Sequence, residues 1–162
     1  MSSGHFEGAH FANSLLVATE LEDAYLEGAN FEGADITQAK FRNAKMTGAN
    51  VILVKKGRGV KFDGADLTGA RFSSSNLQEA SFKNAVLRGA SFEGANLTDA
   101  AFEGADLTGA SFKGKADLTS ASFKGAIIHD ADFEEAFVVG REKFAEANAN
   151  SGTKLPKERS KN

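Results

Sequence analysis

Large apolar residues recur every five positions through most of this 162-residue chain. These residues form three uninterrupted runs, Phe6–Val51, Phe62–Phe112 and Leu118–Val138, which together make 26 five-residue units. A period of five matches neither the 3.6 residues of a helical turn nor the 2 of a strand, so no single regular element puts these side chains on one face. The chain must therefore bend at regular intervals. The core residues expected in the second run and at the start of the third run are Phe62, Leu67, Phe72, Leu77, Phe82, Leu87, Phe92, Leu97, Phe102, Leu107, Phe112, Leu118 and Phe123.

The residues around each large apolar centre predict how the bends are made. Two positions before the centre the residue is Ala in 21 of the 26 units, which puts a small and a large side chain on the same side of a short extended segment. Two positions after the centre, 13 units carry Gly and six more carry Asn or Asp. These residue types adopt positive φ most easily, as a type II turn requires. Each unit is therefore expected to be a brief strand followed by a corner.

The number of sides follows from the strict alternation of Phe and Leu between Phe62 and Phe112. If like residues stack on like in successive coils, the coil has an even number of sides. Two sides would leave almost no interior, and six would leave a lumen too wide for one side chain per side to fill. A four-sided coil of 20 residues remains.

Two irregularities interrupt the count without changing the order of the sides. The step from Phe112 to the next centre is six residues, and we expect the extra residue to bulge out at 114–115. The step from Val51 to the next centre is eleven, which is two sides plus one residue. We expect residues 52–61 to replace one side with a protruding loop, within a repeat domain covering residues 1–140.

Several of the five-residue units resemble the repeat of a known protein family. The segments Ala65-Asp66-Leu67-Thr68-Gly69 and Ala105-Asp106-Leu107-Thr108-Gly109 match the loose consensus A(D/N)LxG of the pentapeptide repeat proteins, and near copies cover about residues 4–140. The resemblance implies an all-β fold, a right-handed quadrilateral β-helix, here of about 6 to 7 coils. It does not by itself imply an activity.

The charge is unevenly distributed along the chain, although the formal net charge is only −3. The segment 52–61 carries Lys55, Lys56, Arg58 and Lys61, which are the candidate partner-binding residues. The tail from residue 141 carries six basic and three acidic residues. The remainder holds 19 acidic and nine basic residues, a net charge of −10, so an acidic rod is expected to bear a basic loop and a basic tail.

The tail divides into two parts. Residues 141–150 contain good helix formers and one large apolar residue, Phe144, and are expected to form a short capping helix over the last coil. Such a cap covers the bare core and the unpaired backbone groups of a solenoid end. Residues 151–162 are polar and charged and are expected to be disordered.

Outward-facing apolar residues occur near both ends of the repeat. Leu15 and Val17 belong to an early coil. Near the other end, a candidate end interface consists of Ile127, Phe137, Val139 and Phe144. These residues are expected either to be buried under the capping helix or to form a homodimer contact.

The sequence offers little for catalysis. It has no cysteine, and His5, His10 and His129 are too scattered to complete a metal site. Asp or Asn residues before the centres, such as Asp35 and Asn76, fall in a line, and local backbone hydrogen bonding is favoured over cation binding for them. We therefore expect no enzymatic activity, cofactor or small-molecule substrate. The absence of a long apolar run predicts no membrane association and a cytoplasmic location, although a leader removed from an exported protein would leave no trace.

Two functions remain. The leading hypothesis is a non-enzymatic rigid scaffold or protein-interaction module with an unidentified protein partner. The alternative is implied by the family resemblance: a DNA-mimicking protein that binds or protects DNA gyrase, a type II topoisomerase. The −10 body favours this alternative, but a ladder of alternating charge disfavours it. The members of that ladder are Glu22, Arg42, Asp63, Lys83, Glu103 and Lys124. Binding of nucleic acid through the basic loop is disfavoured because the acidic body repels phosphate.

Overall fold

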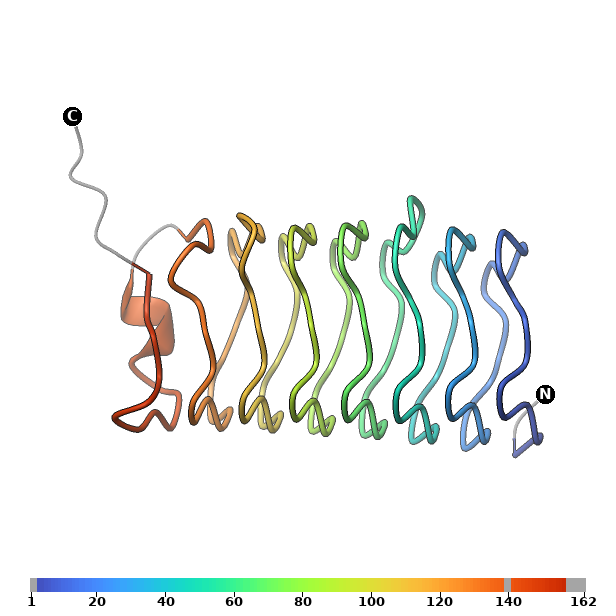
Figure 1. Cartoon of the computed structure of the whole chain (residues 1–162), viewed down its shortest axis with the longest axis horizontal. Helices are drawn as coiled ribbons and strands as arrows, with labels where there is room; N and C mark the ends of the chain where they lie inside the picture. The colour runs from blue at the N-terminus through green and yellow to red at the C-terminus, as the bar shows by residue number, and fades with distance from the viewer. Residues whose placement is uncertain (1–2, 139–140, 157–162) are drawn as a thin grey trace.

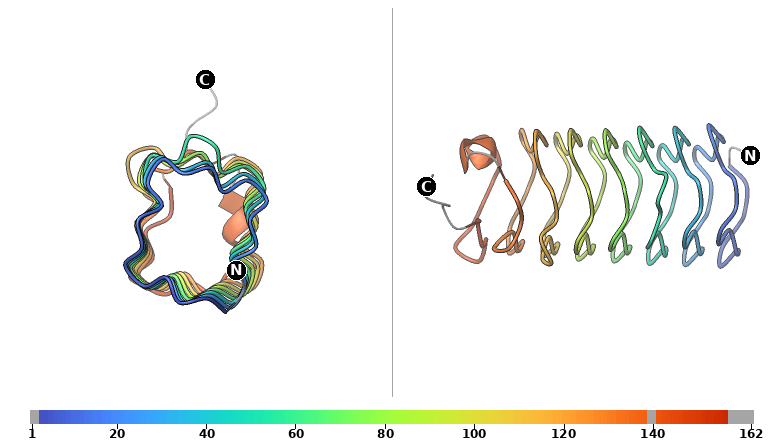
Figure 2. Two further views of the ribbon diagram at one scale, coloured as in Figure 1. Left: turned by 90° about the vertical axis from the view of Figure 1, so that its right-hand side faces the viewer. Right: turned by 90° about the horizontal axis from the view of Figure 1, so that it is seen from above.

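The computed structural model describes residues 3–138 and 141–156 as a straight rod of stacked coils, with the two ends of the chain at opposite ends of the rod (Figure 1). Seen along the rod, the coils superimpose on a nearly rectangular outline with four sides (Figure 2). The four-sided arrangement expected from the Phe and Leu alternation is therefore present.

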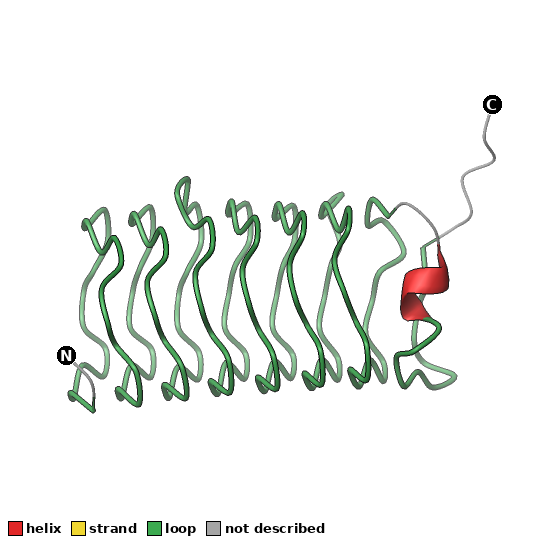
Figure 3. Ribbon diagram, turned by 180° about the vertical axis from the view of Figure 1, so that it is seen from behind, coloured by secondary structure: helices red, strands yellow, loops and turns green. Residues whose placement is uncertain are grey.

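Four ladders of parallel β-bridges define the sides, which we number by the residue that begins each ladder: His5 for side 1, His10 for side 2, Leu15 for side 3 and Glu20 for side 4. Regular coils advance each ladder by 20 residues. Each side contributes one bridging residue per coil, so the described residues contain no run long enough to form a strand, and the ribbon is drawn almost entirely as turns and loops (Figure 3). The expectation of a brief strand on each side is corrected to a single bridge. Among the described residues, the one helical element is η1, a 3₁₀ helix at Arg141–Phe144.

The corners have the backbone geometry that the unit composition predicts. In the first unit, the Ala9 amide donates to the Phe6 carbonyl at 3.0 Å, and Gly8 has a φ of +65°. Non-glycine residues at equivalent positions adopt the same region, for example Asn43 at +55° and Asp99 at +58°. Left-handed φ at the corner is thus a property of the coil and not of glycine alone.

The interior is filled by stacked columns of like side chains. Phe72, Phe92 and Phe112 lie on one wall, side 2, with ring centroids 4.8 and 4.9 Å apart and nearly parallel planes. The opposite wall carries a second Phe column, and its Phe82 meets Phe92 edge to face at 5.5 Å. Both geometries are favourable for aromatic pairs. All thirteen predicted core residues are at most 1% exposed.

The expected ten-residue protruding loop is wrong in extent. Lys56 bridges Asp35 on side 3, and the next unit continues normally with Lys61 bridging Lys40, so the chain does not leave the coil. The side-3 ladder shifts from 20 to 21 residues because one residue, Lys55, is inserted within the side. The coil that contains it rises above its neighbours (Figure 1). A sequence spacing of eleven gives the number of extra residues but not how many residues leave the regular path.

The insertion of Lys55 changes the core at that level. Val54 is turned fully inward, and Gly57 falls where other units have their large apolar centre. A Cβ on Gly57 would lie 2.7 Å from the Asn76 carbonyl oxygen. The buried Ser75 hydroxyl accepts a hydrogen bond from the Val54 amide at 3.0 Å and donates one to the Val51 carbonyl at 2.7 Å. Most units carry Ala at the position of Ser75. Its hydroxyl instead pairs the Val54 amide and the Val51 carbonyl, which the insertion would otherwise leave without a hydrogen-bond partner.

The second extra residue sits in a corner instead of within a side. Residues 113–115 form an extended turn in which Gly114 and Lys115 have φ values of +62° and +64°. The side-3 ladder again shifts to 21 residues, from Asn96 to Asp117. The following Leu118 remains fully buried, so this insertion leaves the core columns intact.

The C-terminal segment continues the coil further than the sequence indicated. Phe144, at the end of η1, takes the next place in the side-4 column and lies 5.0 Å from Phe123. The expected helix over 141–150 is therefore a single 3₁₀ turn, after which Asn148 bridges Ile127. Residues 151–156 are ordered, not disordered, because Lys154 bridges Asp132 and its amide donates to the Ala131 carbonyl. The last part of the expected disordered tail, residues 157–162, lies outside the described residues.

Candidate functional site

The four basic candidate residues come together around side 3. Lys55 stands on the inserted position, and Lys56 and Arg58 follow on the outer face of the same side. Lys61 lies around the corner on side 4. Lys56 Nζ is 3.4 Å from an Asp35 carboxylate oxygen, and Arg58 pairs with the Glu79 carboxylate. Lys55 has no ion pair among those found in the described residues, so its charge is available to a partner.

Exposed apolar side chains lie on the same side of the rod. Leu15 is 81% exposed and Val17 is 53% exposed, and both belong to side 3 in the first coil. Leu53 is 48% exposed at the corner that leads from side 2 into side 3, two residues before the inserted Lys55. The exposed apolar and the basic residues therefore share one face over three successive coils, which we call the side-3 patch: Leu15, Val17, Leu53, Lys55, Lys56 and Arg58.

A hollow of about 200 Å³ lies within the side-3 patch. Leu15 stands on one edge of it, the two lysines of the insertion stand on the other, and Gly33 lies between them without a side chain. The Asn13 amide oxygen lies 2.6 Å from where a Cβ on Gly33 would be. The lining residues are Asn13, Leu15, Gly33, Ala34, Asp35, Lys55 and Lys56.

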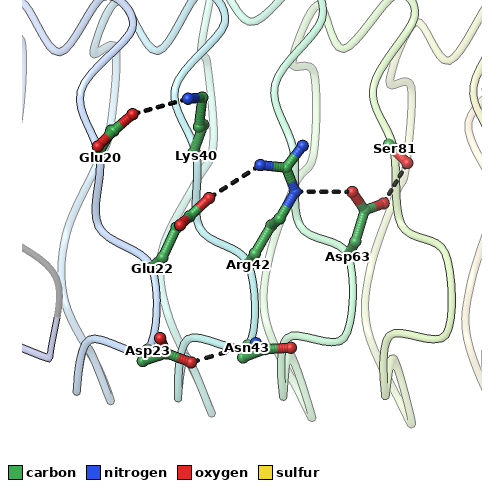
Figure 4. Close-up of polar contacts among 8 residues, drawn as sticks. All are labelled: Glu20, Glu22, Asp23, Lys40, Arg42, Asn43, Asp63 and Ser81. Atoms are coloured by element: carbon green, nitrogen blue, oxygen red, sulfur yellow. Dashed lines mark hydrogen bonds and ion pairs between the residues drawn. The ribbon is translucent and has the colours of Figure 1, made fainter.

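The charge of this region is segregated along the rod. Residues 36–62 contain seven basic and no acidic residues, whereas residues 1–35 contain seven acidic residues and no Lys or Arg. Some of these charges pair across the boundary, as Lys40 does with Glu20 at 2.7 Å (Figure 4). Burial acts to raise the pKa of Asp35, but hydrogen bonds from Thr37 and Lys56 outweigh it and hold that pKa below its usual value. Asp35 is therefore a carboxylate at neutral pH and holds Lys56 in place.

The ladder of alternating charge predicted on side 4 is present. Arg42 lies between Glu22, at 2.9 Å, and Asp63, at 3.4 Å (Figure 4). Lys83 pairs further along with Glu103 at 3.7 Å. The hydrogen bond to Glu22 is the main cause that raises the pKa of Arg42. Side 4 is consequently a neutralised surface and not a continuous acidic stripe.

The candidate end interface is not brought together. Ile127 is partly buried on side 1, Phe137 is 40% exposed on side 3, and Phe144 is buried in the core against Phe123 and Phe133. Val139 lies outside the described residues. The three described residues thus lie on different walls of the coil: Ile127 on side 1, Phe137 on side 3 and Phe144 in the side-4 column.

His5 and the side-3 Asp and Asn residues make local contacts within the coil. No group of three or more His, Cys, Asp or Glu side chains among the described residues could hold a metal ion. His5 instead stacks on Tyr25 at 4.5 Å and contacts Glu7 at 2.9 Å. The predicted line of Asp and Asn on side 3 makes local backbone bonds: the Thr98 amide donates to Asn96 and the Thr119 amide to Asp117, at 3.1 and 2.9 Å.

Sequence reasoning overlooked two parts of the side-3 patch. Leu53 occupies a corner position where most units carry Gly, Asn or Asp, and this departure was a usable signal. The hollow over Gly33 had no such signal, because it depends on which coils lie next to one another.

Comparison with known proteins places these observations in a family. A family model described as pentapeptide repeats matches in eight copies, over residues 5–43, 14–51, 58–89 and 75–114. The chain belongs to the pentapeptide repeat family. The family members share the A(D/N)LxG unit that builds the four walls described above. No curated protein sequence matches the chain, and none of the described helices could cross a lipid bilayer.

Several solved pentapeptide repeat structures are similar to this pentapeptide repeat protein. HetL from the cyanobacterium Nostoc sp. strain PCC 7120, a protein involved in heterocyst differentiation regulation, is 23% identical, with 96% of this chain and 80% of HetL covered and a TM-score of 0.37. QnrB1, a plasmid-mediated fluoroquinolone resistance protein, is 19% identical, with 95% and 90% covered and a TM-score of 0.47. A pentapeptide repeat protein of the Arabidopsis thaliana thylakoid lumen is 30% identical, with 93% and 83% covered and a TM-score of 0.23.

Proposed function

We propose that this protein is a non-enzymatic, rigid interaction module whose protein partner binds the side-3 patch. The observation that carries the proposal is the combination of exposed Leu15, Val17 and Leu53 with an unpaired Lys55 on one face. Exposed apolar side chains that gather with charges around them are typical of protein-binding surfaces. The stacked Phe columns make the rod stiff, so little ordering of the backbone opposes binding.

The proposal is tested by affinity capture from an extract of the source cells. We expect the double variant Leu15→Ser/Leu53→Gly to lose proteins that the wild type retains. Tyr25→Ser is the matched control, since Tyr25 is 40% exposed on side 1 and also presents apolar surface. Retention of the same proteins by the wild type and by the double variant would show that the side-3 patch binds no partner.

A second candidate function is DNA mimicry directed at DNA gyrase. It is favoured by the seven acidic residues within residues 1–35, a segment without Lys or Arg, which concentrate negative charge at one end of the rod although Glu20, Glu22 and Asp35 pair with basic residues of later coils. The side-4 ladder opposes it, because Arg42 and Lys83 interrupt the carboxylates there. A gyrase supercoiling assay with and without a quinolone tests this candidate. If the protein neither inhibits gyrase nor protects it from the quinolone at micromolar concentration, this candidate function is eliminated.

A further inference from the structure

We infer that the hollow in the side-3 patch is a peptide-docking site for an acidic, extended segment of a partner protein that carries one large apolar anchor residue. This inference rests on the proposed function and names the chemistry of the partner. It depends on three independent features of the patch: the strain at Leu53, the placement of Lys55, and the mixed lining of the hollow.

Leu53 is strained because its corner of the coil imposes a positive φ, and nothing in the fold requires a leucine at that corner. Fourteen described non-glycine residues have positive φ, and Leu53, at +56°, is the one large apolar residue among them. The left-handed region disfavours such a side chain by roughly 1–2 kcal/mol. Burial does not offset this strain, because the side chain is 48% exposed. Strain retained at an exposed position points to a contact made with another molecule.

The insertion of Lys55 also weakens the fold while exposing a cation. It leaves Gly57 in a core position where the neighbouring coils have Ile36 and Leu77, both fully buried. What the insertion provides is a raised lysine at the edge of the hollow. Departures from the local sequence rules of a fold are expected at functional sites.

The hollow selects the partner by charge and by shape. Its Leu15 edge offers apolar contact, and its lysine edge belongs to a segment of seven basic and no acidic residues. The two edges are two coils apart, about 10 Å at the usual spacing of parallel β-chains. An extended chain covers that distance in about three residues. The fitting segment therefore has a large apolar residue and a carboxylate about three positions apart.

A single-stranded nucleic acid fits this site less well. Binding without sequence specificity depends on aromatic side chains on which bases stack, and none lines the hollow. Asp35 also faces the hollow as a carboxylate and would repel phosphate. An acidic peptide avoids this repulsion by placing its apolar residue near Leu15 and its carboxylate beside Lys55.

The test uses a random dodecapeptide library displayed on phage and panned against the full chain. We expect enriched peptides to combine a large apolar residue with a carboxylate about three positions away. The affinity of an enriched synthetic peptide, measured by fluorescence anisotropy, should fall about tenfold with Lys55→Glu and should weaken as salt is added. Lys115→Glu is the matched control, because Lys115 is the exposed lysine of the other insertion, about 14 Å further along the rod. This control should leave the affinity within about twofold.

Three results would overturn the inference. They are enrichment of peptides without this pattern, equal binding by the Lys55→Glu and Lys115→Glu variants, and displacement of the peptide by a short single-stranded oligothymidylate at equal concentration. Circular dichroism of each variant checks that the coil is retained. If Leu15→Ser/Leu53→Gly still loses captured proteins while the library gives no acidic apolar peptides, the interaction module stands and only the partner chemistry is wrong.

Discussion

Removing the insertion should make the rod more stable. The variant combines deletion of Lys55 with Gly57→Leu and Ser75→Ala, which restores a regular five-residue unit between Val54 and Gly59. The new leucine enters the side-3 column between two fully buried residues, Ile36 and Leu77. Full burial of a leucine contributes about 1.5–3 kcal/mol. Replacing a glycine whose conformation the new residue tolerates adds about 0.4–1 kcal/mol by restricting the unfolded chain.

One loss offsets part of this gain. The insertion is now held by two hydrogen bonds of the Ser75 hydroxyl, each with a net contribution of about 0.5–1.5 kcal/mol. The regular ladder that replaces the insertion supplies backbone hydrogen bonds of the kind seen in the neighbouring coils, such as Asn96 N to the Ser75 carbonyl at 2.9 Å. The expected net effect is an increase of about 1–3 kcal/mol in the free energy of unfolding.

Urea unfolding followed by circular dichroism measures this change. The midpoint should rise, while the slope of the free energy against urea stays the same, because the surface exposed on unfolding changes little. The matched control is deletion of Lys115, which lies in a corner insertion that leaves the core column intact and should change the midpoint much less. An unchanged or lower midpoint in the Lys55 variant would show that the insertion is not a local weakness of the fold.

Four further variants test other contacts, each by urea unfolding unless stated. Gly57→Ala should destabilise by about 1–3 kcal/mol, because its Cβ would lie 2.7 Å from a backbone oxygen; a stabilised variant would contradict this. Ser75→Ala alone should cost about 1–3 kcal/mol by leaving two buried backbone groups unpaired. Burial acts to raise the pKa of Asp132, but hydrogen bonds from the Glu134 amide and from Lys154 outweigh it and hold that pKa below its usual value. The stabilising contribution of Asp132 is therefore present at neutral pH and is lost as the pH falls through the lowered pKa. Hydrogen exchange in residues 145–156 should then rise in the wild type and should not rise in Asp132→Asn. Arg42→Ala should cost less than about 1 kcal/mol despite its two ion pairs, because they are solvent-exposed.

The walls of the rod were predictable from the sequence because they depend on a period. The alternation of Phe and Leu places Phe72 and Phe92 one coil apart, and a stacked column is the arrangement that buries both rings. The same counting predicted the ladder from Glu22 to Arg42, since residues 20 apart become neighbours in a four-sided coil. Any property that repeats with the coil could be derived in this way.

Features that occur once were predicted poorly. The spacing of eleven after Val51 shows one extra residue, but packing decides that Val54 turns inward and that the chain rejoins the ladder at Lys56. The prediction for the end of the chain was wrong for a related reason. Composition suggested disorder after residue 150, yet Lys154 stays on the coil through its ion pair with Asp132 at 3.0 Å and its backbone bridge. Polar composition does not exclude order where a preformed edge supplies backbone partners.

The two insertions differ in their effect on the core, and this difference supports the role proposed for the side-3 patch. Both add one residue and both keep the order of the sides, so the winding itself does not distinguish between them. The insertion at 113–115 lies in a corner, where the extra residue adopts positive φ and the core is unchanged. The insertion of Lys55 lies within a side and leaves a glycine in the core, next to a strained and exposed Leu53. Since a corner accommodates an extra residue without loss of core packing, selection for folding alone favours the corner, and the position of Lys55 requires an explanation outside the fold. The proposed binding of a partner at the hollow between Leu15 and Lys55 would supply that explanation.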